Sequence, residues 1–158
     1  ETIFAMAMAP VWSMVTKALT EKDYGWIKKL YKRLMLFAGL ASACGFLVIP
    51  LIQWVVNIWL GNKSFTINYY YCFAFAILGS LMILNSVLSS IANGVGELKI
   101  QALFFGIGAA VKVPLSWLCV QVTEAWIGVV IANVLSMAIY CAIQPWWLKK
   151  HLLHKERR

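Results

Sequence analysis

Long apolar runs, separated by short polar segments, dominate the chain. Four of them are long enough to cross about 30 Å of hydrocarbon as a helix rising about 1.5 Å per residue. They cover residues 34–60, 69–92, 100–122 and 126–148. Residues 1–16 are also apolar and lack the basic start and cleavage site of a signal peptide, so we interpret them as the end of a further membrane helix that begins before the given sequence. The pattern predicts an all-α, polytopic transmembrane helix bundle with four full spans and the end of a fifth.

Residues 17–33 differ from these runs. Apolar residues recur at helical spacing from Trp26 to Leu34, basic residues occupy the other face, and Thr20 and Asp23 fit a capping box. We predict a cytoplasmic amphipathic helix on the membrane surface. A simple extension of the following span fits the same pattern and stays open. Within that span, Pro50 predicts a kink.

Composition agrees with a membrane protein. The 158 residues are 62% hydrophobic and 13% charged, whereas soluble domains are about 25% charged. The 14% aromatic content excludes a disordered chain. The four cysteines stand singly within apolar runs, which favours small buried hydrophobes over a disulfide framework.

The basic residues indicate the orientation. Segment 17–33 carries six, the tail 149–158 carries five and the connection 93–99 carries one. The connections on the other side, 61–68 and 123–125, hold only Lys63. The positive-inside rule therefore predicts that 17–33, 93–99 and the C-terminus are cytoplasmic. The basic tail is expected to meet membrane lipids, and we predict no binding to nucleic acid.

One charged residue lies inside a span. Lys112 stands about 18 Å and about 15 Å from the two ends of 100–122, too deep for easy contact with either surface. Intramembrane charge costs about 3 kcal/mol or more, so such a residue usually faces a protein interior or a water-filled cavity. Pairing with a carboxylate is the structural alternative, and no Asp or Glu lies in the four spans.

Polar residues line helical faces beside and opposite Lys112. Gln101 and Ser116 share its face, and Asn85, Ser86, Ser89 and Asn93 lie on one side of 69–92 and just beyond it. A third stripe follows 126–148 at Asn133, Ser136, Tyr140 and Gln144. Each residue alone fits hydrogen bonding between helices. Together they predict a substrate-binding cavity formed by Lys112, Gln101, Ser116, Asn133, Ser136, Tyr140, Gln144 and Asn85.

Motifs for catalysis and cofactors are absent from the sequence. It has no Walker loop, GxGxxG, GxSxG or HExxH pattern. Its two histidines, His151 and His154, stand in the basic tail, where such a pair is usually solvated. We expect no catalytic residues, no metal and no cofactor.

Several segments resemble the polysaccharide and O-antigen flippases of the multidrug/oligosaccharidyl-lipid/polysaccharide exporter superfamily. They are PVWSMV at 10–15, DYGWIKKLYKR at 23–33, IWLG at 58–61, NGVGELKIQ at 93–101, and Pro114. The resemblance implies the C-terminal part of a two-lobe transporter in the bacterial inner membrane. Such a protein moves an undecaprenyl-pyrophosphate-linked oligosaccharide to the outer leaflet by alternating access. Its partners would be that anionic lipid-linked oligosaccharide and the missing N-terminal lobe, with Lys112 facing the anionic group.

Two alternatives remain. A cation-coupled multidrug exporter of the same superfamily would favour carboxylates within the membrane, and the spans contain none. A non-transporting membrane scaffold would use the polar stripes only to join helices. Solvent access to Ser116 and Ser136 distinguishes a transporter from a scaffold.

Overall fold

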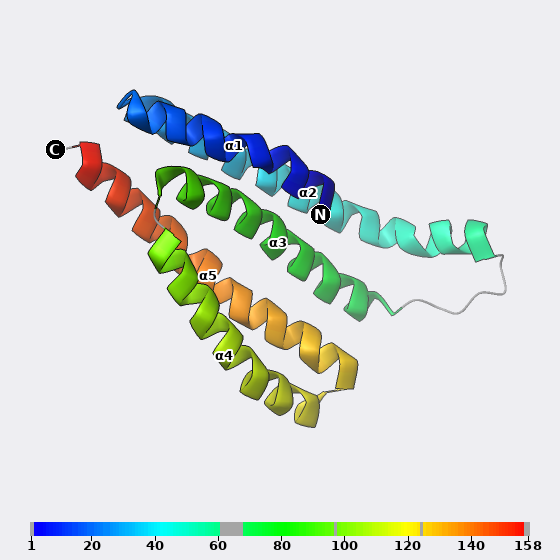
Figure 1. Cartoon of the computed structure of the whole chain (residues 1–158). Coiled ribbons are helices and arrows are strands. Elements are labelled where there is room, and N and C mark those ends of the chain that lie inside the picture. The colour runs from blue at the N-terminus through cyan, green and yellow to red at the C-terminus, as the bar shows by residue number, and fades with distance from the viewer. Residues whose placement is uncertain (1, 61–67, 97, 124, 157–158) are drawn as a thin grey trace.

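The computed structural model describes residues 2–60, 68–96, 98–123 and 125–156 (Figure 1). These residues form five helices and no strand: α1 (Thr2–Thr20), α2 (Tyr24–Leu60), α3 (Tyr69–Val95), α4 (Leu98–Val122) and α5 (Ala125–Glu156). Four of the helices contain candidate spans that are long and apolar enough to cross a membrane: Tyr24–Leu60, Tyr69–Val95, Gln101–Val122 and Trp126–Leu148. The all-α prediction is confirmed, and the chain is a multi-pass membrane protein.

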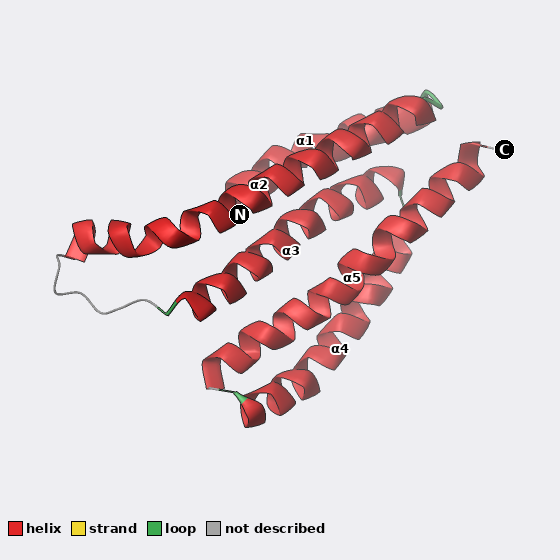
Figure 2. Ribbon diagram, turned by 180° about the vertical axis from the view of Figure 1, so that it is seen from behind, coloured by secondary structure: helices red, strands yellow, loops and turns green. Residues whose placement is uncertain are grey.

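α3 is the central helix. It packs against α1, α2 and α5, whereas α4 packs mainly against α5 and contacts α3 only slightly (Figure 2). The hydrophobic core lies where α3 ends and joins side chains of four helices, including Val15 of α1, Ile27 of α2, Ile91 of α3 and Leu148 of α5. None of the described α4 side chains belongs to this core, so α4 stands at the edge of the bundle.

α1 and α3 touch at a glycine. Thr16 Oγ1 of α1 donates a hydrogen bond to the Gly94 carbonyl oxygen over 3.2 Å. A Cβ at position 94 would lie 2.5 Å from Val15 Cβ and 2.9 Å from the Trp12 carbonyl oxygen. Only glycine permits this approach, so position 94 sets the distance between the two helices.

The basic segment 17–33 differs from its prediction. α1 continues to Thr20, whose hydroxyl donates to the Lys17 carbonyl oxygen over 2.7 Å, so Thr20 ends α1 instead of capping the next helix. Lys22 turns the chain at φ 60°, and Asp23 Oδ1 accepts a hydrogen bond from the Trp26 amide over 2.9 Å, as an N-cap does. No separate surface helix follows. α2 is continuous from Tyr24 because Ile27, only 1% exposed, extends the buried face of the span into the basic segment.

The end of α2 departs from the direction of its beginning. Both ribbon views show the change in its last third, where Pro50 lies (Figures 1 and 2). Proline removes one backbone donor and crowds the preceding turn, which bends a helix without ending it. Residues beyond the bend remain helical to Leu60.

The basic segments meet at one end of the bundle. The α1–α2 turn, the end of α3 and the C-terminal end of α5 lie together on the left in Figure 1. The opposite end holds the aromatic contact between Tyr71 of α3 and Trp126 of α5, with ring centroids 4.4 Å apart. The segments predicted to be cytoplasmic therefore lie at one end of the bundle, as the positive-inside prediction requires. Lys63 lies outside the described residues.

Thiol labelling in intact cells tests the side of the membrane. We expect a single cysteine at Ser64, in the connection 61–68, to react with an impermeant reagent, and one at Lys22 to react only after permeabilisation. Both substitutions are made in a background without Cys44, Cys72, Cys119 and Cys141. Labelling in the reverse order would invert the predicted orientation.

Candidate functional site

Polar side chains from α3, α4 and α5 lie between these helices near the end of α3. We name this the polar cluster, and its members are Asn85, Ser89, Asn93, Gln101, Tyr140 and Gln144. Tyr140 and Gln144, one turn apart on α5, are 5% and 3% exposed. Ser89 and Gln144 face the Tyr140 hydroxyl, and Ser89 Oγ donates to Asn85 Oδ1 over a long 3.4 Å. These contacts join Asn85, Ser89, Tyr140 and Gln144, and Asn93 and Gln101 lie at the adjoining ends of α3 and α4. The cluster thus contains four of the predicted site residues, Asn85, Gln101, Tyr140 and Gln144.

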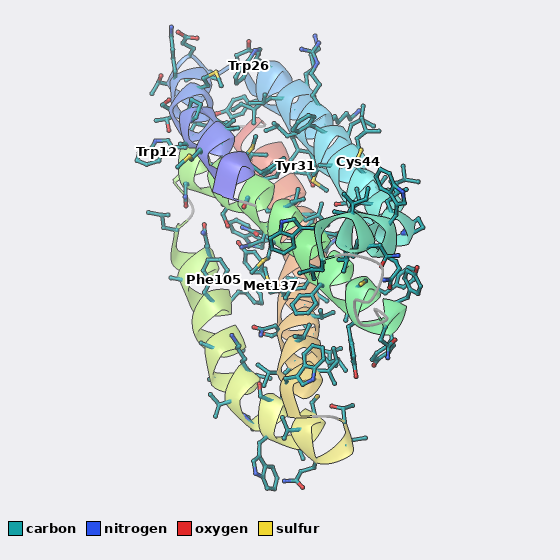
Figure 3. The ribbon with its side chains drawn as sticks, turned by 90° about the vertical axis from the view of Figure 1, so that its right-hand side faces the viewer. Trp12, Trp26, Tyr31, Cys44, Phe105 and Met137 are labelled. Atoms are coloured by element: carbon teal, nitrogen blue, oxygen red, sulfur yellow. The ribbon has the colours of Figure 1, made fainter. Side chains whose placement is uncertain are left out.

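The pairing of α4 with α5 brings Gln101 to this cluster. The two helices run antiparallel, and Ser136 Oγ donates to the Gly108 carbonyl oxygen over 3.2 Å. The rings of Phe105 and Tyr140 stack with centroids 4.8 Å apart, and Figure 3 shows α4, with Phe105 labelled, alongside α5, with Met137 labelled. One turn further toward the start of α4, the same antiparallel pairing puts Gln101 level with Gln144. The rings of Phe104 and Phe105 both contact the ring of Tyr140 at the side of the cluster.

Four buried side-chain oxygens of the polar cluster have no hydrogen-bond partner among the described residues. The buried atoms Asn93 Oδ1, Gln101 Oε1, Tyr140 Oη and Gln144 Oε1 complete no hydrogen bond with any described residue. Burying a polar group without a partner costs about 1–3 kcal/mol. A membrane protein that keeps four such atoms between three helices therefore needs water or a ligand to satisfy them.

The other predicted site residues occupy a second position, nearer the middle of the membrane. Lys112 of α4 is exposed, and the same register sets it level with Asn133 of α5. Asn133 Nδ2 donates to the Val129 carbonyl oxygen of its own helix over 3.0 Å, and Ser116 is half-buried. No ion pair joins Lys112 to another residue in the described ranges. Four of the predicted residues thus belong to the polar cluster, whereas Lys112, Ser116, Asn133 and Ser136 lie farther along α4 and α5.

Lys112 and the polar cluster are well separated along α4. Gln101 and Lys112 are eleven positions apart in the same helix, a rise of about 16 Å. The predicted back of the helix, at Leu103 and Trp117, is 59% and 65% exposed and makes the surface away from α5. Helical spacing predicts one face of α4 for Gln101 and Lys112, but it did not reveal that only Gln101 lies level with Gln144.

Two cluster members, Ser89 and Asn93, were not among the residues predicted to form the cavity. Ser89 and Asn93 follow Asn85 at spacings of four and eight, so all three share one face of α3. That spacing was visible in the sequence. This face of α3 belongs to the cluster because α5 packs beside it, and the sequence did not reveal where α5 lies.

Comparison with protein-family models, with curated proteins and with solved structures finds no match to this chain. The fold and the polar cluster define it as a multi-pass α-helical membrane protein with unpaired polar groups between three helices.

Proposed function

We propose that the chain is part of a membrane transporter, a flippase that carries a lipid-linked oligosaccharide across the bacterial inner membrane by alternating access. The observation that carries this proposal is the set of buried polar atoms without partners between α3, α4 and α5. A hydrophilic head group crossing hydrocarbon needs donors and acceptors to replace water. The polar cluster offers them in an uncharged form.

The cluster argues against a scaffold. Polar groups that only join helices form hydrogen bonds across the helix interface, as Ser136 does with Gly108 and Thr16 does with Gly94. The four unpaired atoms make no such bond to a described residue. A scaffold would lose stability by keeping them, whereas a transporter requires them free.

The position of Lys112 indicates that a second surface, on α4, lines the transport path. An exposed ammonium at mid-membrane depth is too costly to face lipid tails. α4 leaves this side open because it packs mainly on α5. We therefore assign the face of α4 that bears Lys112 to a hydrated path shared with an N-terminal lobe. The absence of carboxylates from the spans disfavours the cation-coupled drug exporter.

Removing the unpaired polar atoms tests the proposal. In the longer protein to which we assign the chain, Tyr140→Phe with Gln144→Leu deletes two of them while keeping similar volume. We expect the amount of folded protein to change little, because Ser89 and Gln144 approach the Tyr140 hydroxyl but neither Tyr140 Oη nor Gln144 Oε1 completes a hydrogen bond with a described residue. Transport per inserted molecule should fall about tenfold or more, the equivalent of about 1.4 kcal/mol. Surface polysaccharide in a flippase-deficient strain, divided by inserted protein, is the measurement.

Thr16→Val is the matched control. It removes a hydroxyl, outside the polar cluster and the Lys112 face, whose hydrogen bond to the Gly94 carbonyl oxygen joins α1 to α3. We expect a small loss of stability, about 1 kcal/mol, with transport per molecule nearly unchanged. Parental transport by the double variant would refute the transport role of the cluster and favour the scaffold.

A further inference from the structure

One exposed stripe of α2 begins with cations and continues with apolar side chains. Lys29, Lys32 and Arg33 are exposed and recur at helical spacing. The same face continues with Leu36 (67% exposed), Phe37 (54%) and Leu40 (58%). We name these six residues the α2 stripe. It places three positive charges directly above a strip of exposed hydrocarbon.

The cations of the stripe lack a balancing charge on their own helix. Like charges at spacings of three and four repel, and Lys29 stands in both relations to Lys32 and Arg33. The first turn of α2 has no acidic residue, and no Asp or Glu occurs from Tyr24 to Leu60. The nearby carboxylate of Asp23 accepts the Trp26 amide as a cap. An anion from outside the helix would relieve this repulsion.

The apolar part of the stripe has a fixed shape and a suitable length. The ring of Phe37 stacks on Phe4 of α1, with centroids 5.8 Å apart and planes at 13°. One leaflet offers about 15 Å of hydrocarbon, or about ten helical residues below Arg33. That distance covers Leu36, Phe37 and Leu40, so a single acyl chain matches the strip.

The basic end of α5 shows a contrasting arrangement. Lys150 Nζ lies 5.5 Å from the centroid of the Trp146 ring, so its charge is already engaged within the same helix. Among the described residues, no aromatic ring makes such a contact with Lys29, Lys32 or Arg33. The α2 stripe is thus the better anion site at this end of the bundle.

We propose that the α2 stripe binds one anionic phospholipid of the leaflet that meets the α1–α2 turn. Its phosphate contacts Lys29, Lys32 and Arg33, where the guanidinium offers two parallel donors to phosphate oxygens. Its acyl chain lies along Leu36, Phe37 and Leu40. This lipid is a bound partner of the protein and is separate from the polar cluster between α3, α4 and α5.

Lipid titration tests the site in the purified protein. Native mass spectrometry and thermal unfolding are followed as phosphatidylglycerol or phosphatidylcholine is added in mild detergent. We expect phosphatidylglycerol to bind as a single copy and to raise the unfolding temperature, because a ligand of the folded state stabilises it. The triple variant Lys29→Gln, Lys32→Gln, Arg33→Gln should raise the apparent Kd on the order of 100-fold.

A matched triple variant separates a site from diffuse charge. Lys17→Gln, Lys22→Gln, Lys150→Gln removes three exposed cations from the same end of the bundle. We expect this control to change the Kd by about threefold or less, since only long-range attraction is lost. Equal weakening in both triple variants would overturn the proposal, and so would equal binding of the zwitterionic lipid.

Two further measurements distinguish loss of lipid binding from misfolding, and a lipid site from a site that binds phosphate alone. In phosphatidylcholine the stripe variant should unfold at or above the parental temperature, because repulsion between its cations is gone. Leu36→Ala with Leu40→Ala keeps the cations and should still weaken phosphatidylglycerol binding. Should glycerol phosphate stabilise the parent as strongly as the lipid does, the acyl contact is absent and the lipid assignment fails.

Discussion

Gly94→Ala is expected to destabilise the protein by about 1–3 kcal/mol, although alanine favours helices over glycine. The added methyl would lie 2.5 Å from Val15 Cβ and 2.9 Å from the Trp12 carbonyl oxygen. One of these obstacles is backbone, so α1 and α3 must separate. The separation also strains the hydrogen bond from Thr16 to the Gly94 carbonyl oxygen. Thermal unfolding in mild detergent measures the effect.

Gly79→Ala, in the same helix, should have the opposite sign. Nothing lies within 4 Å of a Cβ built at position 79. Alanine there keeps every contact and gains helix propensity of up to about 1 kcal/mol. A double variant of Gly94→Ala with Val15→Gly should recover part of the loss, because it removes one of the two obstacles. Equal behaviour of the variants at 79 and 94 would contradict the described contact between α1 and α3.

The spans were predictable because hydropathy and length alone determine them. Runs of apolar residues had to be helices in lipid, where every backbone group needs an internal partner. The extent of α2 was less predictable because a basic amphipathic segment fits both a surface helix and an extension of a span. The burial of Ile27 against α1 and α3 decided between them, and that contact is tertiary.

The sequence did not predict which glycines lie at close contacts between helices. Gly106 and Gly108 stand in the same stretch of α4, yet nothing lies within 4 Å of a Cβ at 106, whereas one at 108 would lie 3.3 Å from Ser136 Oγ. Gly128 of α5 approaches the backbone of Cys119 and Val120 in the same way, at 2.8 Å from a built Cβ. Which glycine packs depends on where the neighbouring helix lies.

The sequence predicts which side of each helix bears the polar residues of the candidate site. It does not predict which of these residues lie at the same level on neighbouring helices. A helical wheel placed Gln101 and Lys112 on one side of α4, as the structure also has them. It gave no information on the level of α5, which sets Gln101 beside Gln144 and leaves Lys112 exposed beside Asn133. Helical spacing describes one helix, whereas a site is formed by the register between helices.

Lys112 offers a test in which charge and size are separated. It is exposed at mid-membrane depth on the open side of α4, and no ion pair joins it to another described residue. If it meets an anionic part of the substrate, Lys112→Arg keeps the charge and should retain much of the transport. The variant Lys112→Ala removes the attraction.

We expect Lys112→Ala to lower transport per inserted molecule by about tenfold to 100-fold, the range of one strong charged contact of about 1.5–3 kcal/mol. Lys112→Glu should be worse, because a negative charge at this position then repels the anionic part of the substrate. Lys150→Ala, which removes a cation outside the spans, serves as the control and should transport normally. Inserted protein is quantified in parallel, since a Lys that pairs with a carboxylate in another part of the protein would lower the folded amount when removed. Parental transport by a normally inserted Lys112→Ala would show that Lys112 does not contact the substrate.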